Sequence, residues 1–181
     1  MREFEAHFLE IDVVETEKKL AALGAVKISD SLLKEIIFDK PDRSWNPIQK
    51  RVRIRADGKK VDLAYKEQIA YNTMGGTEEY EFEVSDLDAA KAFVEKLGLI
   101  PIREQEKKRI RYKLGDMVFD IDSWPKIPPY LEIESDSEIK VKAAAEKLGL
   151  DWSKACFLDA KQIYEDVYNI KPLDDVYLLT F

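Results

Sequence analysis

Charged residues at every second position constrain the fold of this chain more than any other feature of its sequence. Three such stretches are acidic (residues 3–5, 79–83 and 132–134), and two are basic (residues 51–55 and 107–111). In an extended strand, successive side chains point to opposite faces, so each stretch predicts a strand with one charged and one apolar face. A single sheet that contained all five strands would bring stacked acids and stacked bases onto one surface.

The composition predicts one globular domain over residues 1–181. The chain has 181 residues, of which 45% are hydrophobic and 36% are charged, and its formal net charge is −7. This length is sufficient for a buried core. The acidic balance disfavours a broad basic surface, so we expect no nucleic-acid partner.

Cysteine content and hydropathy indicate the compartment. The single cysteine, Cys156, cannot form an internal disulfide, and its apolar neighbours predict a packed thiol. No segment approaches the roughly 18 apolar residues that a membrane-spanning helix needs. The chain begins in a strand-like segment without an apolar signal region, so we expect a cytoplasmic protein with no membrane partner.

Hydrophobic periodicity and turn residues predict a sheet of eight strands interrupted by helices. The helices begin near capping residues, and the first three end near Leu-Gly or Gly positions. The strands are expected at about residues 2–11, 32–38, 50–56, 60–66, 79–84, 107–113, 117–122 and 130–134. Helices are expected over residues 12–24, 87–97, 139–148 and 151–170, with a further candidate strand over 176–181.

This order of elements predicts an α+β fold. Sequential strands joined by hairpins and helical excursions favour an eight-stranded antiparallel sheet, closed or nearly closed into a β-barrel, with the helices packed outside. The apolar strand residues expected against the helices are Phe4, Val52, Ile54, Tyr80, Phe82, Ile110, Phe119, Ile121, Leu131 and Ile133. The charged side chains must then point away, either into solvent or into a hydrated lumen, and the sequence leaves both possibilities open.

The segregation of acids from bases indicates more than a solvated sheet face. The alternative interpretation is that the charged residues only solvate an exposed face of an antiparallel sheet. On such a face acids and bases are normally mixed, whereas here they are separated, and neighbouring like charges repel unless a bound ion offsets them. Clustered carboxylates are hard oxygen ligands suited to Mg²⁺ or Mn²⁺. The candidate metal ligands are Glu3, Glu5, Glu81, Glu83, Asp120, Asp122, Glu132 and Glu134.

The cations suit phosphate. Arginine recognises phosphate oxygens through a planar fork and lysine acts as a point charge. The candidate triphosphate-binding residues are Arg53, Arg55, Lys66, Lys107, Arg109 and Arg111. For Arg51, on the same strand face, a surface position is the alternative.

In order along the chain, these motifs resemble the CYTH superfamily, also called triphosphate tunnel metalloenzymes. Each motif is weak alone, but their ordered combination over almost the whole chain is specific. Residues 3–7 match the opening ExExK motif except at His7, and residues 107–112 match KxRxxY. Further similar segments are 37–39 with 53–55, 63–66, 81–83, 120–122 and 131–134.

The resemblance implies an eight-stranded antiparallel tunnel whose lumen binds a triphosphate and one or two divalent metal ions. The acids matching the family's motifs would supply the metal side, and the matching cations, from Arg53 to Arg109, would supply the phosphate side. Lys66 and His7 are the candidate catalytic residues. Because histidine replaces the motif's lysine, His7 could activate water, donate a hydrogen bond to phosphate or simply pack in the strand.

The leading functional hypothesis is metal-dependent hydrolysis of an inorganic or small organic triphosphate. One alternative is an adenylate cyclase of the class IV type, which would convert ATP to cyclic AMP and pyrophosphate. Another alternative is a nucleotide- or polyphosphate-binding module without turnover. The sequence leaves open the organic group, the number of metal ions and whether the protein forms a homodimer.

Overall fold

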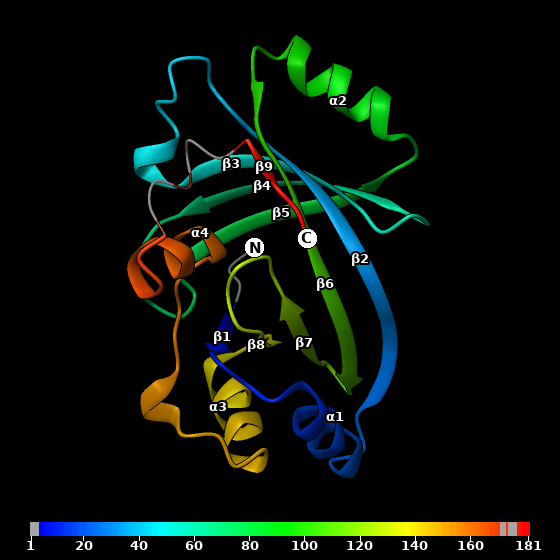
Figure 1. The fold of residues 1–181 in the computed structure, drawn as a ribbon, viewed down its shortest axis with the longest axis vertical. Helices are drawn as coiled ribbons and strands as arrows, with labels where there is room; N and C mark the ends of the chain where they lie inside the picture. Colours follow the sequence, from blue (N-terminus) through cyan, green and yellow to red (C-terminus); the bar gives the residue numbers. More distant parts are fainter. Residues whose placement is uncertain (1–3, 171–172, 174–176) are drawn as a thin grey trace.

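The computed structural model describes residues 4–170, 173 and 177–181, and these form one strongly curled sheet with helices on its outside (Figure 1). The strand order is β1-β8-β7-β6-β2-β3-β4-β5, and all these neighbours pair antiparallel. The strands are β1 (Phe4–Phe8), β2 (Val26–Asp39), β3 (Lys50–Ala56), β4 (Val61–Gln68), β5 (Thr77–Val84), β6 (Ile100–Leu114), β7 (Met117–Ser123) and β8 (Tyr130–Ser135). The predicted eight-stranded antiparallel α+β fold is therefore confirmed.

The barrel is nearly closed rather than closed. In the described part of the chain, no strand pairing joins β1 to β5, the two ends of the strand order. A short β9 (Leu178–Leu179) lies off this path and pairs parallel with β6. Residue 176, where the last strand was expected to begin, lies outside the described residues.

Two long strands, β2 and β6, run through both halves of the sheet (Figure 1). Both begin earlier than predicted, at Val26 instead of residue 32 and at Ile100 instead of residue 107. The early part of β2 is mixed in polarity, with a register shift between Lys27 and Ser29. Its strand conformation therefore comes from long-range pairing with β6 and not from local alternation.

Three helices on the outer face match the predicted positions within a few residues. They are α1 (Val13–Ala22), α2 (Leu87–Lys96) and α3 (Glu138–Lys147). The Asp12 carboxylate accepts a hydrogen bond from the Glu15 amide, and Asp86 caps α2 in the same way. Figure 1 shows α1 and α3 at one end of the sheet and α2 at the other.

The predicted helix over residues 151–170 is wrong. The chain forms a 3-10 turn (Trp152–Lys154), runs extended through Cys156, and then forms α4 (Ala160–Gln162) and a π-helical turn (Ile163–Val167). Two backbone hydrogen bonds between Cys156 and His7, of 2.8 and 2.9 Å, hold the extended part against β1. Helix formation starts afresh at Asp159, which forms a capping box with Gln162.

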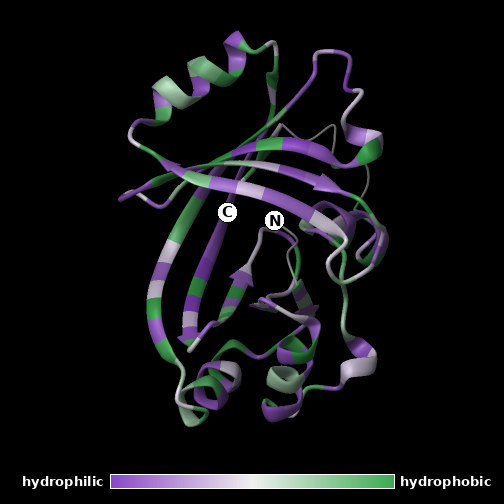
Figure 2. Cartoon of the chain, turned by 180° about the vertical axis from the view of Figure 1, so that it is seen from behind, coloured by the Kyte–Doolittle hydropathy of each residue, from purple (hydrophilic) through white to green (hydrophobic). Residues whose placement is uncertain are grey.

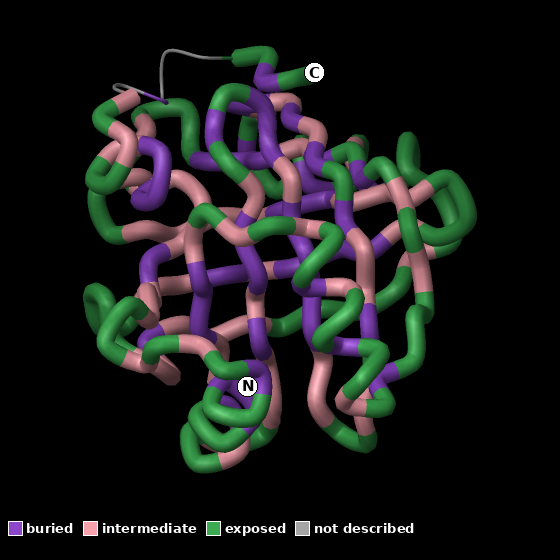
Figure 3. Tube along the Cα trace, turned by 60° about the horizontal axis from the view of Figure 1, so that its bottom comes forward, coloured by how far each residue is buried: buried purple, intermediate pink, exposed green. Residues whose placement is uncertain are grey.

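Buried residues concentrate on the strands, as Figure 3 shows along the centre of the trace. Phe119, Ile121, Leu131 and Ile133 are at most 1% exposed and pack in one cluster with residues of α1 and α3, as predicted. The prediction for Tyr80 and Phe82 is wrong, because their exposed fractions are 58% and 59%. Helix α2 contacts β3 and β6 and leaves Tyr80 and Phe82 uncovered on the outer face of β5, whereas Val84 at the end of that strand packs against the same cluster as α2.

Among the described residues, no helix combines the length and the apolar character needed to cross a bilayer.

Candidate functional site

The inner face of the curled sheet encloses a polar cavity of about 290 Å³. Figure 2 shows hydrophilic residues alternating with hydrophobic ones along the strands that surround it. The charged side chains thus face an enclosed cavity, which resolves the alternative that the sequence left open. The predicted site residues that line it are Glu5, His7, Arg53, Arg55, Lys66, Glu81, Lys107, Arg109, Arg111, Glu132 and Glu134.

One group of cations comes from β6. The Arg109 guanidinium forks onto Asp122, with Nε–Oδ1 and Nη2–Oδ2 distances of 2.6 Å, and contacts Asp120 at 2.5 Å. Asp120 also binds Arg111, and Asp122 also binds Lys107 at 2.9 Å. Such forked, charge-assisted pairs hold a guanidinium in one orientation.

Asp120 and Asp122, predicted as metal ligands, lie on β7 beside the β6 cations and are not among the residues that line the cavity. Their exposed fractions are 1% and 0%. Burial raises the pKa of Asp122, but Arg109 and Lys107 more than offset this effect and lower it overall. In this arrangement both carboxylates are counter-ions that hold the cations in place.

The second group of cations comes from β3 and β4 and is paired with acids of β5. Arg53 contacts Glu79 at 3.0 Å and Glu81 at 2.7 Å, and Lys66 contacts Glu79 at 2.9 Å. Arg55 contacts Glu81 at 2.9 Å. Glu81, a predicted metal ligand, is therefore engaged by two arginines.

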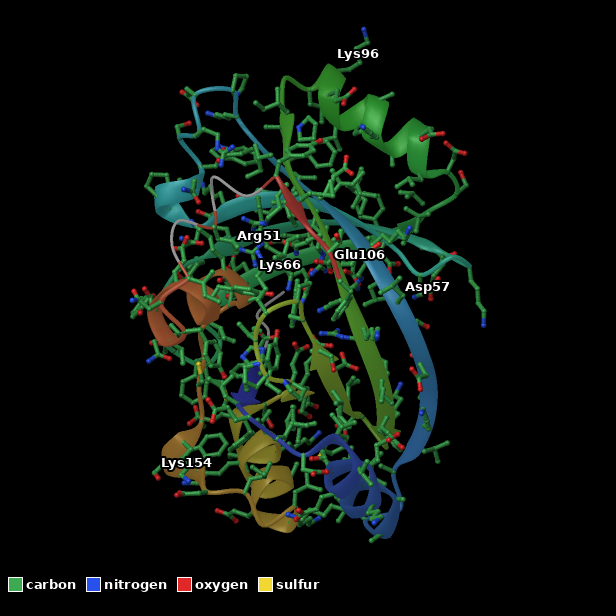
Figure 4. All side chains as sticks on the ribbon, viewed as in Figure 1. Arg51, Asp57, Lys66, Lys96, Glu106 and Lys154 are labelled. Carbon is green, nitrogen blue, oxygen red and sulfur yellow. The ribbon has the colours of Figure 1, made fainter. Side chains whose placement is uncertain are left out.

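Arg51 does not lie apart at the surface. It lines the cavity and forms an ion pair of 2.8 Å with Asp159. Figure 4 shows Arg51 and Lys66 within the interior of the molecule, whereas the labelled Lys96 and Lys154 extend outward from its periphery.

The opposite side of the cavity is acidic and is formed by β1 and β8. The register places Glu5 beside Glu134 and His7 beside Glu132. We name these four residues the acid wall. Arg109 reaches Glu132 at 3.1 Å, but within the described residues no cation forms an ion pair with Glu5 or Glu134.

The acid wall carries an excess of negative charge. Burial, followed by the nearby carboxylates of Glu132, Glu5 and Asp120, raises the pKa of Glu134 to about 7. Unpaired carboxylates held this close repel one another, and a divalent cation would relieve the repulsion. This observation indicates where a hard metal ion fits.

Two predicted metal ligands are not part of this cavity. Glu83 is exposed near the end of β5 and does not line it. Glu3 lies outside the described residues.

Several residues that line the cavity were missed by the sequence analysis. Glu35 on β2 is 3% exposed and accepts a hydrogen bond of 2.6 Å from Gln105. Burial raises the pKa of Glu35, but Lys107, Arg53 and Arg55 more than offset it and lower it to about 2. The other missed charged or amide residues are Asp39, Asn46, Gln49, Lys50, Glu79, Arg103, Gln105, Asp159 and Lys161. The spacing of residues 35, 37 and 39 could have placed β2 on the cavity, whereas no local signal marks Asp159.

His7 is buried on the acid wall and still lines the cavity, with an exposed fraction of 3%. Its Nε2 lies 3.3 Å from Glu132 Oε2, and its ring meets Tyr130 edge to face at 5.2 Å. Burial lowers the pKa of His7, but the Glu132 hydrogen bond and the charges of Glu5 and Glu132 outweigh it and raise the pKa overall.

Comparisons with known proteins agree with this geometry. A sequence-family model described as CYTH domain matches residues 1–162. No curated protein matches the chain. A conserved hypothetical protein from Pyrococcus furiosus is 25% identical, with a TM-score of 0.69 over 84% of this chain and 94% of that chain.

Two further solved structures are below 25% identical and show the fold alone. A candidate adenylate cyclase from Vibrio parahaemolyticus is 14% identical, with a TM-score of 0.76 over 91% of this chain and 98% of that chain. The Hippeastrum protein HpAC1, reported to have a dominant triphosphatase activity, is 13% identical, with a TM-score of 0.60 over 96% and 99% of the two chains.

Proposed function

The chain belongs to the CYTH domain family, and we propose that it binds a triphosphate in its cavity and hydrolyses it with the help of a divalent metal ion. The observation that carries this proposal is that a cluster of cations and the acid wall line one cavity. The cations come from β3, β4 and β6, and Arg109 of β6 reaches Glu132 of the acid wall at 3.1 Å. A linear polyphosphate bridged to carboxylates by a metal ion is complementary to both.

The size of the cavity favours a small substrate. Ligand-binding cavities commonly span about 300–1,000 Å³, and this one, at about 290 Å³, is at the lower limit. Inorganic triphosphate, or a triphosphate whose organic group extends toward a cavity mouth, is compatible with that volume.

The acid wall fits Mg²⁺ or Mn²⁺, because Glu5, Glu132 and Glu134 offer oxygen ligands and two of them have no cationic partner among the described residues. A divalent ion bound there would neutralise phosphate oxygens and help to activate water.

Within this site, the chain's own residues bind and orient the substrate. Arg53 and Arg55 would exchange carboxylate partners for phosphate oxygens, and Arg109 would exchange Glu132. Asp120 and Asp122 would hold the β6 cations in position. Water attacks the terminal phosphorus in line with the bridging oxygen that leaves, and Lys66 stabilises the negative charge that develops on the leaving group. No covalent intermediate is required.

The test is release of phosphate from tripolyphosphate in Mg²⁺ or Mn²⁺. Glu132→Gln removes a central acid of the wall, and we expect it to lower the rate on the order of 100-fold. Glu106→Gln is the control, because Glu106 pairs with the exposed Lys34 away from the cavity, and it should retain the wild-type rate.

The same assay separates the alternative functions. A panel of tripolyphosphate, ATP, GTP and thiamine triphosphate is incubated with each metal ion, and all products are resolved. Cyclic AMP and pyrophosphate from ATP would show a cyclase, and tight binding without any product would show a binding module. Either result would contradict hydrolysis as the function.

A further inference from the structure

His7 gives the acid wall a nitrogen atom that can ligate a metal ion, at the position where the ExExK motif has lysine. An ammonium group cannot ligate a metal ion, whereas a neutral imidazole can. We propose that His7, Glu5 and Glu132 form a mixed nitrogen and oxygen site that binds a borderline divalent ion such as Zn²⁺ more tightly than Mg²⁺. This inference rests on the proposed function only in assigning the metal ion to the acid wall.

The three side chains are close enough to share one ion. One ligand atom from each of Glu5, His7 and Glu132 lies within 4.8 Å of the others. Nitrogen and oxygen ligands bind Zn²⁺ at about 2.0–2.2 Å in tetrahedral geometry, so two ligand atoms of one ion are about 3.4 Å apart. Small side-chain rotations therefore suffice to bring the three atoms onto one ion.

Backbone hydrogen bonds on both edges of β1 hold Glu5 and His7 in place. His7 lies opposite Glu132 in the pairing of β1 with β8, and its other edge forms two hydrogen bonds with Cys156. Glu5 and His7 are two residues apart on one strand, so both point to the cavity face. Such a site on rigid strands is organised before the ion binds.

The His7 ring lacks a full set of polar partners. The exposed fraction of His7 is only 3%, and its Nδ1 has no hydrogen-bond partner within the described residues. Its Nε2 makes a single long contact of 3.3 Å with Glu132. Buried polar atoms are usually satisfied, so a ring in this state indicates a missing ligand.

The chemistry of the donor set determines which ion is preferred. Carboxylate oxygens alone suit Mg²⁺, whereas imidazole favours Zn²⁺ and other later first-row ions. Mg²⁺ also gives up its bound water reluctantly. A site with one imidazole and two carboxylates should therefore discriminate between the two ions.

The experiment uses the fact that His7 is the only histidine in the chain. The full chain, labelled with ¹⁵N-histidine and made without a histidine tag, has a single imidazole to observe by NMR. At about pH 8, where protons compete less with the ion for the ring than at lower pH, we titrate the metal-free protein with Zn²⁺ and separately with Mg²⁺. We expect Zn²⁺ to shift the imidazole nitrogen signals at a 1:1 ratio, and Mg²⁺ to bind more weakly and leave the nitrogens nearly unshifted.

Two variants sharpen the comparison. His7→Gln should weaken Zn²⁺ binding at least about tenfold in calorimetry and change Mg²⁺ binding little. Cys156→Ser is the matched control, because it removes the only thiol that could bind Zn²⁺ on its own, and it should retain the wild-type affinity. Zn²⁺ binding that leaves the imidazole signals unchanged would overturn the inference without requiring that any variant folds.

Failure of this inference is distinct from failure of the proposed function. Imidazole shifts in a protein that releases no phosphate would support the metal site and contradict hydrolysis. Hydrolysis of tripolyphosphate by a protein whose imidazole never responds to Zn²⁺ would contradict the metal site alone.

Discussion

At the scale of single residues, the cavity contains carboxyl groups whose surroundings shift the pKa in opposite directions. Glu35 is surrounded by cations and by Gln105, whereas Glu134 is surrounded by other acids. Both are glutamates on strands of the same sheet. Their opposite environments lead to opposite dependences of stability on pH.

Glu35 should stabilise the fold at neutral pH. Its pKa is about 2 in the folded state and 4.5 in the unfolded state, so its contribution is present above about pH 4.5 and is lost as the pH falls toward 2. We expect Glu35→Gln to lower the free energy of unfolding by about 3 kcal/mol at pH 7, and by less at pH 3.5. Urea denaturation at both pH values measures this, and an equal loss at the two pH values would contradict it.

Glu134 should destabilise the metal-free fold at high pH. Its pKa is about 7 in the folded state and 4.5 in the unfolded state, so the folded state loses stability as the pH rises from 4.5 to 7. We expect Glu134→Gln to raise the free energy of unfolding by about 2 kcal/mol at pH 8 and to have little effect at pH 4.5. The measurement is urea denaturation in the presence of a chelator. If the free energy of unfolding did not rise at pH 8, repulsion among the acid-wall carboxylates would not destabilise the fold.

At the scale of elements, each strand has a polar inner face toward the cavity and an outer face whose burial depends on the nearest helix. The outer face of β7 and β8 packs with residues of α1 and α3, whereas that of β5 is open at Tyr80 and Phe82. Alternation predicts which residues share a face, but it does not predict which face a helix covers.

This difference predicts unequal costs for similar substitutions. Phe119→Ala on β7 removes a fully buried ring and should lower the free energy of unfolding by about 3–5 kcal/mol. Phe82→Ala on β5 removes a ring that is 59% exposed and should cost less than about 1 kcal/mol. Chemical denaturation of the two variants compares them directly, and similar losses would show that the outer face of β5 is covered in solution.

At the scale of the whole molecule, residues 155–167, which we name the closing segment, bridge the gap between β1 and the ends of β3 and β4. Cys156 pairs with His7 on one side. On the other side, Asp159 binds Arg51, and the amides of Gln162 and Gln68 bond to each other at 2.9 and 3.2 Å. The segment therefore completes the cavity where strand pairing does not.

We therefore propose that residues 1–181 act as one domain and that the cavity depends on the closing segment. A chain ending at residue 154 should lose the Arg51 and Gln68 contacts and the cluster that Tyr164 and Leu158 form with Trp124. We expect a lower melting temperature and weaker binding of tripolyphosphate. The control is Gln68→Ala in the full chain, which removes the pair of amide contacts with Gln162, leaves the Asp159 capping box in place and should reduce both quantities only slightly. Unchanged binding by the shortened chain would show that the strands alone make the site.

The local sequence determined much of this protein. Alternation of charge in residues 51–55, 107–111 and 132–134 identifies strands and the residues that share a face, because the side-chain period of a strand is two. The order of these motifs also identifies the family and eleven of the cavity residues. Helix starts at Asp12 and Asp86 follow from capping chemistry, which depends only on residues three apart.

Only the tertiary structure decided which charges pair and how the cavity closes. Asp120 and Asp122 have the same spacing as the acid-wall residues, yet they form ion pairs with Arg109 and Arg111 because pairing of β6 with β7 sets their register. The extended path of Cys156, the missed Glu35 and the exposed Tyr80 likewise depend on partners distant in sequence. The physical reason is that local periodicity fixes the face of a side chain, whereas its neighbours across the sheet determine its charge environment and burial.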